Sequence, residues 1–194
     1  MIIISHRVNT IDQLSKITKE YGIEIDLRTK NEKIIISHDP FKNGIYFEDW
    51  IKYYKHKLLV LNIKEDGLEG EIIKILKKNK IEKFFFLDQS FPSIIKSINK
   101  SEKRCAIRIS EYESIETAIS LRGKVEWIWI DHFNKFPLNF KECKYLKNLG
   151  FKICIVSPEL QKGNLNSAKE LKNKLSYYKI KFSAVCTKYP EIWI

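Results

Sequence analysis

Short apolar runs without polar alternation recur along the whole chain, and most are followed by a segment with helical periodicity. Such runs indicate strands that are buried on both faces, as in parallel sheets. About eight strand–helix units predict an α/β fold, a compact (β/α)8 TIM barrel that lacks the final helix. An open doubly wound sheet is the alternative. The expected strands are residues 2–5, 23–27, 58–63, 84–87, 105–109, 125–130, 151–156 and 182–186.

Helix boundaries are marked by capping residues and by glycine. Periodic apolar residues over 11–21 predict a helix that ends at the glycine that follows. Ser110 with Glu113 has the spacing of a capping box, in which each side chain bonds the other residue's backbone N–H, and Asn139 with Glu142 marks the start of another helix. We expect two further helices to begin at this serine and this asparagine.

Length and composition predict one domain over residues 1–194. Hydrophobic residues make up 44% of the chain and charged residues 30%, as in ordinary soluble globular proteins. No apolar run approaches the ~18 residues of a membrane-spanning helix. The opening MIIISHR is too short for a signal peptide and lacks its basic start. We expect a cytoplasmic protein without a transmembrane segment, and no feature of the sequence specifies its oligomeric state.

The net charge of +11 raises the question of nucleic-acid binding. The excess is nearly all lysine and is spread along the predicted helices, whereas arginine, which contacts bases and phosphates better, is scarce. This distribution favours a solvated outer surface that attracts anionic substrates, with no nucleic acid as partner. Nucleic-acid binding is kept as a weaker alternative.

The four cysteines are widely spaced and form no CxxC pair. Zinc and redox sites usually contain closely spaced cysteine pairs, so neither is the leading interpretation. Cys105, Cys154 and Cys186 lie in apolar, strand-like runs. This placement predicts buried free thiols in a reducing compartment.

Charged and titratable residues follow nearly every expected strand. In (β/α)8 barrels the carboxyl ends of the strands form one rim, and active sites lie there. Loops are polar in any case, which accounts for Asp88 and Lys188 but accounts less well for charges embedded in apolar strands. The candidate site residues are His6, Arg7, Glu24, Asp26, His38, Asn62, Lys64, Arg108, Asp131 and Glu159.

Glu24 and Asp26 alternate with apolar residues in GIEIDLR, so both side chains point to one face of the strand. Inward-facing carboxylates are costly unless they are paired or bind a metal. A hard divalent cation with oxygen ligands, such as Mg²⁺ or Ca²⁺, is the favoured partner. An ion pair with Arg28 or Lys64 is the alternative. Asn62 and Lys64 repeat the spacing in LVLNIKE, and the Asn62 carbonyl could complete the metal site.

His6 and His38 flank this carboxylate pair in the sequence. Imidazole is available in neutral and protonated form near pH 7, so one ring can accept a proton while the other donates one. Two such rings beside a cation site suit the cleavage of a phosphodiester. His56 lies in a lysine-rich stretch and is expected at the surface, and His132 is a weaker candidate for substrate contact.

The same residues resemble the motifs of the glycerophosphodiester phosphodiesterase family, within the phosphatidylinositol-phospholipase-C-like superfamily of barrels. The family's first strand ends in His-Arg-Gly, and here His6 and Arg7 are followed by Val8. The resemblance spans the chain, but its strong motifs lie in the first third. The other similar positions are Glu24 and Asp26 for Glu-x-Asp, His38 and Asp39 for His-Asp, Asn62 and Lys64 for Glu-x-Lys, and residues 187–190 for a Thr-Asp-x-Pro turn.

The resemblance implies hydrolysis of a small glycerol- or polyol-phosphate diester. His6 and His38 would act as general acid and base, and Mg²⁺ or Ca²⁺ would bind Glu24, Asp26 and Asn62. Arg7 and Lys64 would bind the phosphate, with Arg108, Asp131 and Glu159 as further substrate contacts at the rim. The amide of Asn62 in place of the family's third acidic ligand should weaken cation binding. This departure keeps open a barrel that binds a phosphorylated sugar or headgroup without catalysis.

The stretches FFFLDQSFP, IRISEYE and IVSPEL are also similar to a small bacterial subgroup associated with capsule and other surface-polysaccharide genes. That similarity implies a place in surface-polysaccharide metabolism. Substrate choice is expected to lie in the loops after the fourth to seventh strands, around Gln89, Tyr112, His132 and Gln161.

Overall fold

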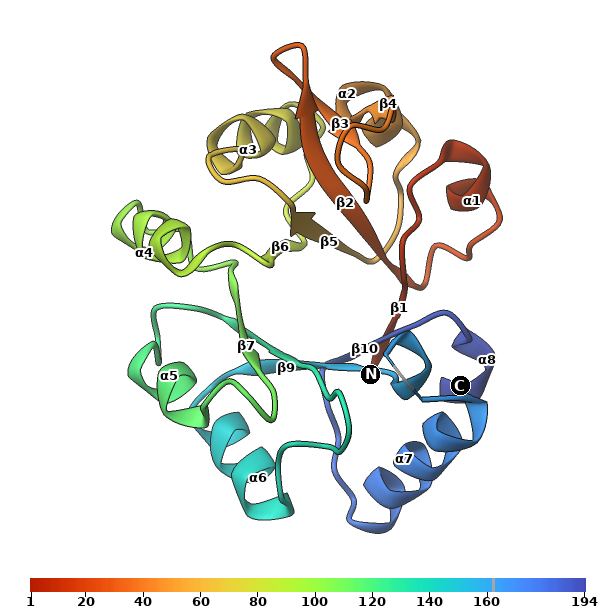
Figure 1. The fold of residues 1–194 in the computed structure, drawn as a ribbon, viewed down its shortest axis with the longest axis vertical. Coiled ribbons are helices and arrows are strands. Elements are labelled where there is room, and N and C mark those ends of the chain that lie inside the picture. Colours follow the sequence, from red (N-terminus) through yellow and green to blue (C-terminus); the bar gives the residue numbers. More distant parts are fainter. Residues whose placement is uncertain (162) are drawn as a thin grey trace.

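A computed structural model describes residues 1–161 and 163–194, which form a barrel of parallel strands surrounded by helices (Figure 1). Strands and helices alternate along the chain, as the apolar runs predict. The α/β fold class, a TIM barrel, is confirmed. Within the described residues, the eight barrel strands are β1 (Ile2–Ser5), β2 (Gly22–Lys30), β5 (Leu58–Ile63), β6 (Phe84–Leu87), β7 (Ala106–Ile109), β8 (Trp127–Ile130), β9 (Lys152–Val156) and β10 (Ala184–Thr187).

The helices lie outside the ring of strands (Figure 1). Between β2 and β5 the chain makes an antiparallel excursion, in which β3 pairs with both β2 and β4, and His38 lies two residues after the end of β3. The remaining elements are α1 (Ile11–Ser15), β3 (Lys33–Ile36), β4 (Ile45–Tyr46), α2 (Phe47–Trp50), α3 (Glu69–Lys78), α4 (Phe91–Asn99), α5 (Ile115–Ser120), α6 (Phe140–Asn148), α7 (Leu165–Tyr177), α8 (Pro190–Trp193), and the 3-10 turns η1 (Ile51–Tyr53) and η2 (Pro158–Leu160).

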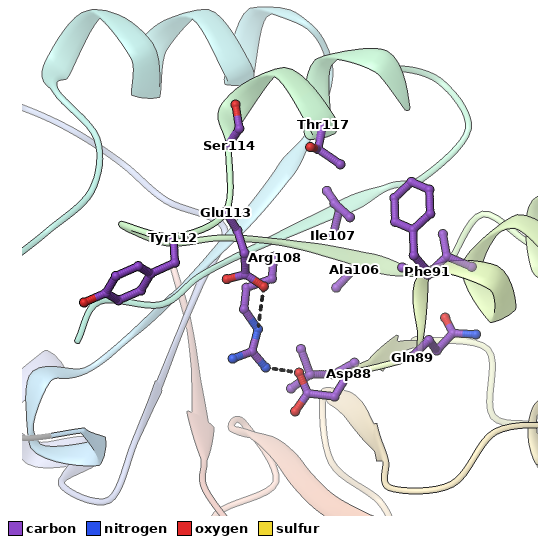
Figure 2. Close-up of a pocket in the computed structure, with 12 residues that line it drawn as sticks. Asp88, Gln89, Phe91, Ala106, Ile107, Arg108, Tyr112, Glu113, Ser114 and Thr117 are labelled. Atoms are coloured by element: carbon purple, nitrogen blue, oxygen red, sulfur yellow. Dashed lines mark hydrogen bonds and ion pairs between the residues drawn. The ribbon is translucent and has the colours of Figure 1, made fainter.

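The ring of strands has one weakly paired seam. β1 pairs with β2 on one side and with β10 on the other, which argues against the open doubly wound sheet. In the described part of the chain, β6 and β7 meet through a single parallel bridge between Phe86 and Cys105. There the Phe86 N–H donates to the Arg104 carbonyl oxygen at 2.8 Å. Figure 2 shows the side chains along this seam, with α5 and α4 on its two sides.

Two apolar layers hold the barrel together. The outer layer lies between the strands and the helices, and the inner layer fills the barrel. In the inner layer the ring of Phe85 stacks on that of Trp127 with centroids 4.4 Å apart, and Trp129 lies beside them. Small side chains complete this layer, which is how a narrow barrel accommodates large aromatic rings. They are Ala106, Cys154, Ala184 and Cys186.

The helix expected over 11–21 is too long. α1 ends at Ser15, and the β-branched Ile17 and Thr18 that follow disfavour its continuation. Gly22 does not end a helix but begins β2. A Cβ atom at this glycine would lie 2.9 Å from Cγ1 of Ile4, so the residue permits the close approach of two strands.

The helix expected to open at Ser110 begins later. The Ser110 hydroxyl donates to Glu113 Oε2 at 2.6 Å and closes a turn after β7. Ser114 caps α5 instead, because its Oγ accepts the Glu116 N–H at 3.1 Å. The helix predicted to start at Asn139 is confirmed as α6, and a capping box between Asn139 and Glu142 opens it.

Three other expectations concern the end of the chain, the thiols and the membrane. The final helix is present as the single turn α8 rather than missing. The four cysteines, all among the described residues, are free and buried, as predicted. No helix in the described ranges has both the length and the apolar character needed to cross a bilayer.

The aromatic stack inside the barrel generates a stability prediction. Phe85 is fully buried, so Phe85→Ala should lower the free energy of unfolding by about 3–5 kcal/mol through lost burial and an unfilled cavity. Tyr177→Ala, at a residue that is 80% exposed, is the control and should change it by less than about 0.5 kcal/mol. Urea denaturation measures both. Equal effects of the two substitutions would contradict a tightly filled interior.

Candidate active site

The alternation along β2 places its two carboxylates inside the barrel. Ile23, Ile25 and Leu27 belong to the outer apolar layer, so the residues between them point toward the barrel interior. There Glu24 is 1% exposed and Asp26 is fully buried. The inward orientation expected from GIEIDLR is therefore confirmed.

A cavity of about 200 Å³ opens at the carboxyl ends of the barrel strands. It is small compared with typical ligand pockets of ~300–1,000 Å³, so it suits a group of only a few heavy atoms. Parallel pairing brings its lining together from most of the strands. Seven predicted site residues line it: His6, Arg7, Glu24, Asn62, Lys64, Arg108 and Asp131.

Arg7 has a left-handed backbone conformation, with φ of 53°. A non-glycine residue in this region is strained, and such strain is found most often at functional sites. The turn directs the Arg7 N–H to Glu24 Oε2 at 2.7 Å. The next residue, Val8, is buried in the outer layer, and its N–H donates to the Glu24 carbonyl oxygen at 2.9 Å. Valine is thus accommodated where the family has glycine.

Glu24 is held by hydrogen bonds at both carboxylate oxygens. Oε2 accepts the Arg7 N–H, and Oε1 accepts the Asn62 side-chain N–H at 3.0 Å. Burial, and then the nearby Asp26 carboxylate, raise the pKa of Glu24 to about 7, although both hydrogen bonds act in the lowering direction. The ionised form of this acid is therefore under electrostatic strain that a neighbouring positive charge would relieve.

Asp26 is bound by an amide that the sequence analysis missed. The Asn9 side chain donates to Asp26 Oδ2 at 2.9 Å, and its carbonyl oxygen accepts the Asp26 backbone N–H at 3.1 Å. On the other side, the Lys64 ammonium lies 3.2 Å from Asp26 Oδ1. Of the two ion pairs considered from the sequence, the one with Lys64 is present, whereas Arg28 instead bonds the His38 carbonyl oxygen.

The two candidate histidines are brought to the same end of the barrel. His6 Nε2 lies 3.9 Å from Glu24 Oε2, and burial, followed by the positive charge of Arg7, lowers the pKa of His6 to about 4. His38 Nε2 contacts the Arg7 guanidinium, and its Nδ1 lies 2.7 Å from Asp39 Oδ1. A guanidinium can only donate, so Nε2 is the acceptor and the ring proton lies on Nδ1.

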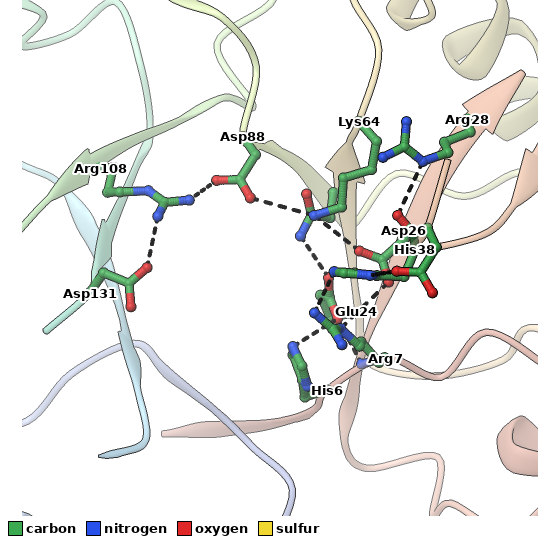
Figure 3. A network of polar contacts seen from close by, with 12 residues as sticks. His6, Arg7, Glu24, Asp26, Arg28, His38, Lys64, Asp88, Arg108 and Asp131 are labelled. Atoms are coloured by element: carbon green, nitrogen blue, oxygen red, sulfur yellow. Dashed lines mark hydrogen bonds and ion pairs between the residues drawn. The ribbon is translucent and has the colours of Figure 1, made fainter. Parts of the chain in front are cut away.

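Charges of alternating sign continue from the Asp26–Lys64 ion pair around the rim (Figure 3). Lys64 Nζ lies 3.9 Å from Asp88 Oδ2, and Asp88 also pairs with Arg108. Arg108 in turn donates to Asp131 Oδ2 at 2.9 Å. Asp88, which the sequence analysis attributes to general loop polarity, therefore joins two of the three cationic side chains of the cavity, Lys64 and Arg108. Like Arg7, it has a left-handed backbone, with φ of 58°.

Other polar residues near the rim have structural partners. Glu159 accepts the Thr187 hydroxyl at 2.6 Å and the Lys188 N–H at 3.1 Å, so its carboxylate fixes the end of β10. His132 is buried, and its Nε2 bonds the Val156 carbonyl oxygen at 2.8 Å. His56 is half-buried rather than exposed, and its ring bonds a backbone carbonyl.

The oxygen atoms of the proposed metal ligands fit a cation. The strand register sets Asp26 beside Asn62. Oδ1 of Asn62 is buried and has no hydrogen-bond partner among the described residues, whereas Oδ1 of Asp26 is buried with the Lys64 ammonium 3.2 Å away. Hard divalent cations take carboxylate and amide oxygens of this kind. Within 1–161 and 163–194, no three His, Cys, Asp or Glu side chains are placed to hold a metal, so the candidate set remains two carboxylates and one amide.

Solved structures with a similar fold include two phosphodiesterases and one enzyme of different chemistry. The glycerophosphoryl diester phosphodiesterase from Parabacteroides distasonis has a TM-score of 0.67 and 13% identity, over 98% of this chain and 84% of that one. The glycerophosphodiester phosphodiesterase from Agrobacterium tumefaciens has a TM-score of 0.68 and 11% identity, over 99% of this chain and 97% of that one. The tryptophan synthase alpha subunit from Campylobacter jejuni has a TM-score of 0.57 and 12% identity, over 96% of this chain and 86% of that one.

No family model matches this sequence, and no curated protein matches it. The likeness to glycerophosphodiester phosphodiesterases that the motifs predict is confirmed at the level of the fold. Because a tryptophan synthase subunit has the same type of fold, the function must be inferred from the site itself.

The two hydrogen bonds between Asn9 and Asp26 generate a second prediction. Asn9→Ala leaves a buried carboxylate oxygen and a backbone N–H without their partner, so the free energy of unfolding should fall by about 1–3 kcal/mol at pH 7. Asn134→Ala, at an exposed amide, is the matched control and should have little effect. Chemical denaturation of wild-type protein and both variants measures these free energies of unfolding. A fully stable Asn9→Ala protein would show that Asp26 does not depend on this amide.

Proposed function

We propose that the protein hydrolyses a small glycerol- or polyol-phosphate diester, with His6 and His38 as the general acid–base pair. The observation that carries the proposal is the link between the two rings. His6 lies beside Glu24, Glu24 accepts the Arg7 N–H, and the Arg7 guanidinium contacts His38. One ring would accept a proton from the attacking hydroxyl or water, and the other would donate a proton to the departing alcohol oxygen.

The cavity supports the binding of a phosphoryl group. Arg7, Lys64 and Arg108 line it, and they are the groups that would contact phosphate oxygens. Carboxylates of Glu24, Asp88 and Asp131 line the same cavity, so its cations are largely neutralised. An anionic diester therefore gains little from the side chains alone, and further positive charge would favour its binding.

Glu24, Asp26 and the Asn62 carbonyl would hold a divalent cation, Mg²⁺ or Ca²⁺. Such a cation supplies the positive charge that stabilises a reacting phosphate. The buried Asn62 Oδ1, which has no hydrogen-bond partner among the described residues, and the raised pKa of Glu24 support this assignment. In this proposal Glu24 and Asp26 bind the cation, Arg7 and Lys64 orient the phosphate, and the two imidazoles transfer protons.

A second candidate function is phosphate-ester binding without turnover. It is favoured by Asn62, since an amide ligand leaves the cation site with less negative charge than a third carboxylate would. Turnover distinguishes the two functions, because a binding module would retain substrate and release no alcohol.

Loss of the imidazoles is the direct test of catalysis. His6→Ala and His38→Ala should each lower kcat for a glycerophosphodiester by about 10²–10⁴-fold, the usual contribution of general acid–base catalysis. His56→Ala, a histidine remote from the cavity, should retain activity per folded molecule. Phosphate-ester products are measured after repurification, with Mg²⁺, Ca²⁺ and Mn²⁺ in turn. The proposal fails if wild-type protein cleaves no diester under any of these conditions.

Asn62→Asp tests the cation site without relying on activity. A third carboxylate should lower thermal stability in chelator and enlarge the rise in Tm on adding Mg²⁺ or Ca²⁺, with cation affinity about tenfold tighter. Asn134→Asp adds the same charge at an exposed position and should leave the cation-induced shift unchanged. If Asn62→Asp responds to cations no more than wild-type protein does, these residues do not form the cation site.

A further inference from the structure

The seam between β6 and β7 opens into a groove of about 600 Å³ (Figure 2). The groove runs along the ends of these strands and past the first turns of α4 and α5. Among the described residues, the two strands beside it share a single bridge. Its volume lies within the range of ligand sites and is three times that of the cavity at the barrel mouth.

The walls of the groove combine aromatic faces with hydrogen-bonding groups. Phe91 and Tyr112 stand at opposite ends in Figure 2 and are 48% and 75% exposed. Ile94 and Ala106 contribute apolar surface between them. The hydroxyls of Ser114 and Thr117 line one wall and can donate hydrogen bonds. Exposed aromatic rings next to hydroxyls suit a ligand that has both C–H faces and hydroxyl groups.

The charges in the groove neutralise each other. Arg108 pairs with Asp88 and lies 3.8 Å from Glu113, so neither carboxylate is free to bind a cationic headgroup. The guanidinium is likewise committed to acids on both sides. An uncharged ligand fits such a surface better than a charged one, because a charged ligand would have to break an existing pair.

The groove adjoins the proposed phosphate cavity. Leu87, Asp88 and Arg108 line both spaces. A diester whose phosphate lies between the two histidines could therefore extend one of its alcohol groups past Arg108 into the seam.

On the basis of the proposed phosphodiesterase function, we propose that the groove binds an uncharged polyhydroxylated group, a sugar or cyclic polyol, esterified to the phosphate. Phe91 and Tyr112 contact its C–H faces, and Ser114 and Thr117 bond its hydroxyls. The groove then determines the substrate class, since small alcohols and cationic headgroups gain nothing from it.

The test compares two diesters that share a glycerol phosphate and differ in the second alcohol. The probes are glycerophosphoinositol and the ethyl ester of glycerol 3-phosphate. Thr117→Trp fills the groove and should lower kcat/KM for glycerophosphoinositol about tenfold or more, while the ethyl ester changes less than about twofold. Glu116→Trp places the same bulky side chain on an exposed position of α5 and should affect neither substrate. Circular dichroism confirms that both variants fold.

Equal slowing of both diesters by Thr117→Trp, or no slowing of either, overturns the groove proposal and leaves the phosphodiesterase function intact. If wild-type protein cleaves neither diester, the phosphodiesterase function fails, and binding of free myo-inositol then tests the groove alone. Saturable amide shifts at Phe91, Tyr112 and Thr117, present in Glu116→Trp and lost in Thr117→Trp, support the groove. Absence of saturable shifts at concentrations on the order of 50 mM overturns it.

Discussion

The burial of two adjacent carboxylates at the mouth of a narrow barrel is the constraint on which the rest of the site depends. Glu24 and Asp26 are almost completely removed from water, where an uncompensated charge costs several kcal/mol. Neighbouring loops and strands therefore supply donors: the Arg7 N–H, the amides of Asn9 and Asn62, and the Lys64 ammonium. The left-handed backbone at Arg7 also helps to stabilise the buried carboxylates, because it turns the Arg7 N–H toward Glu24.

This compensation extends into a chain of alternating charges that also connects the two cavities. Asp88 lies between Lys64 and Arg108, at the end of β6 where the barrel is least well paired. The same ion pair thus forms one wall of the phosphate-sized cavity and one wall of the larger groove. Where β6 and β7 share only one backbone bridge among the described residues, the ion pair between Asp88 and Arg108 links the two strands through their side chains.

Several features were predictable from backbone geometry alone. Side chains alternate along a strand with a period of two, which gave the inward direction of Glu24 and Asp26. Parallel strands end at a common rim, which gave the gathering of both histidines. Asn9 was not predictable in this way, since loop side chains have no fixed direction before the backbone turn is known. Asp88 was assigned to ordinary loop polarity because its partners are distant in sequence. The contacts of Glu159 were equally hidden in the sequence: its carboxylate, predicted at the rim as a substrate contact, is engaged by Thr187 and the backbone after β10.

The barrel itself does not determine the chemistry, since phosphodiesterases and a tryptophan synthase subunit have the same type of fold. What distinguishes this chain is the set of groups in and beside one small cavity: two imidazoles, two buried acids and an amide whose carbonyl oxygen has no hydrogen-bond partner among the described residues. An unpartnered buried oxygen is costly to retain unless something binds it. The Asn62 side-chain N–H already donates to Glu24 Oε1, so its free carbonyl oxygen is the atom that supports the proposed role of this amide as a cation ligand.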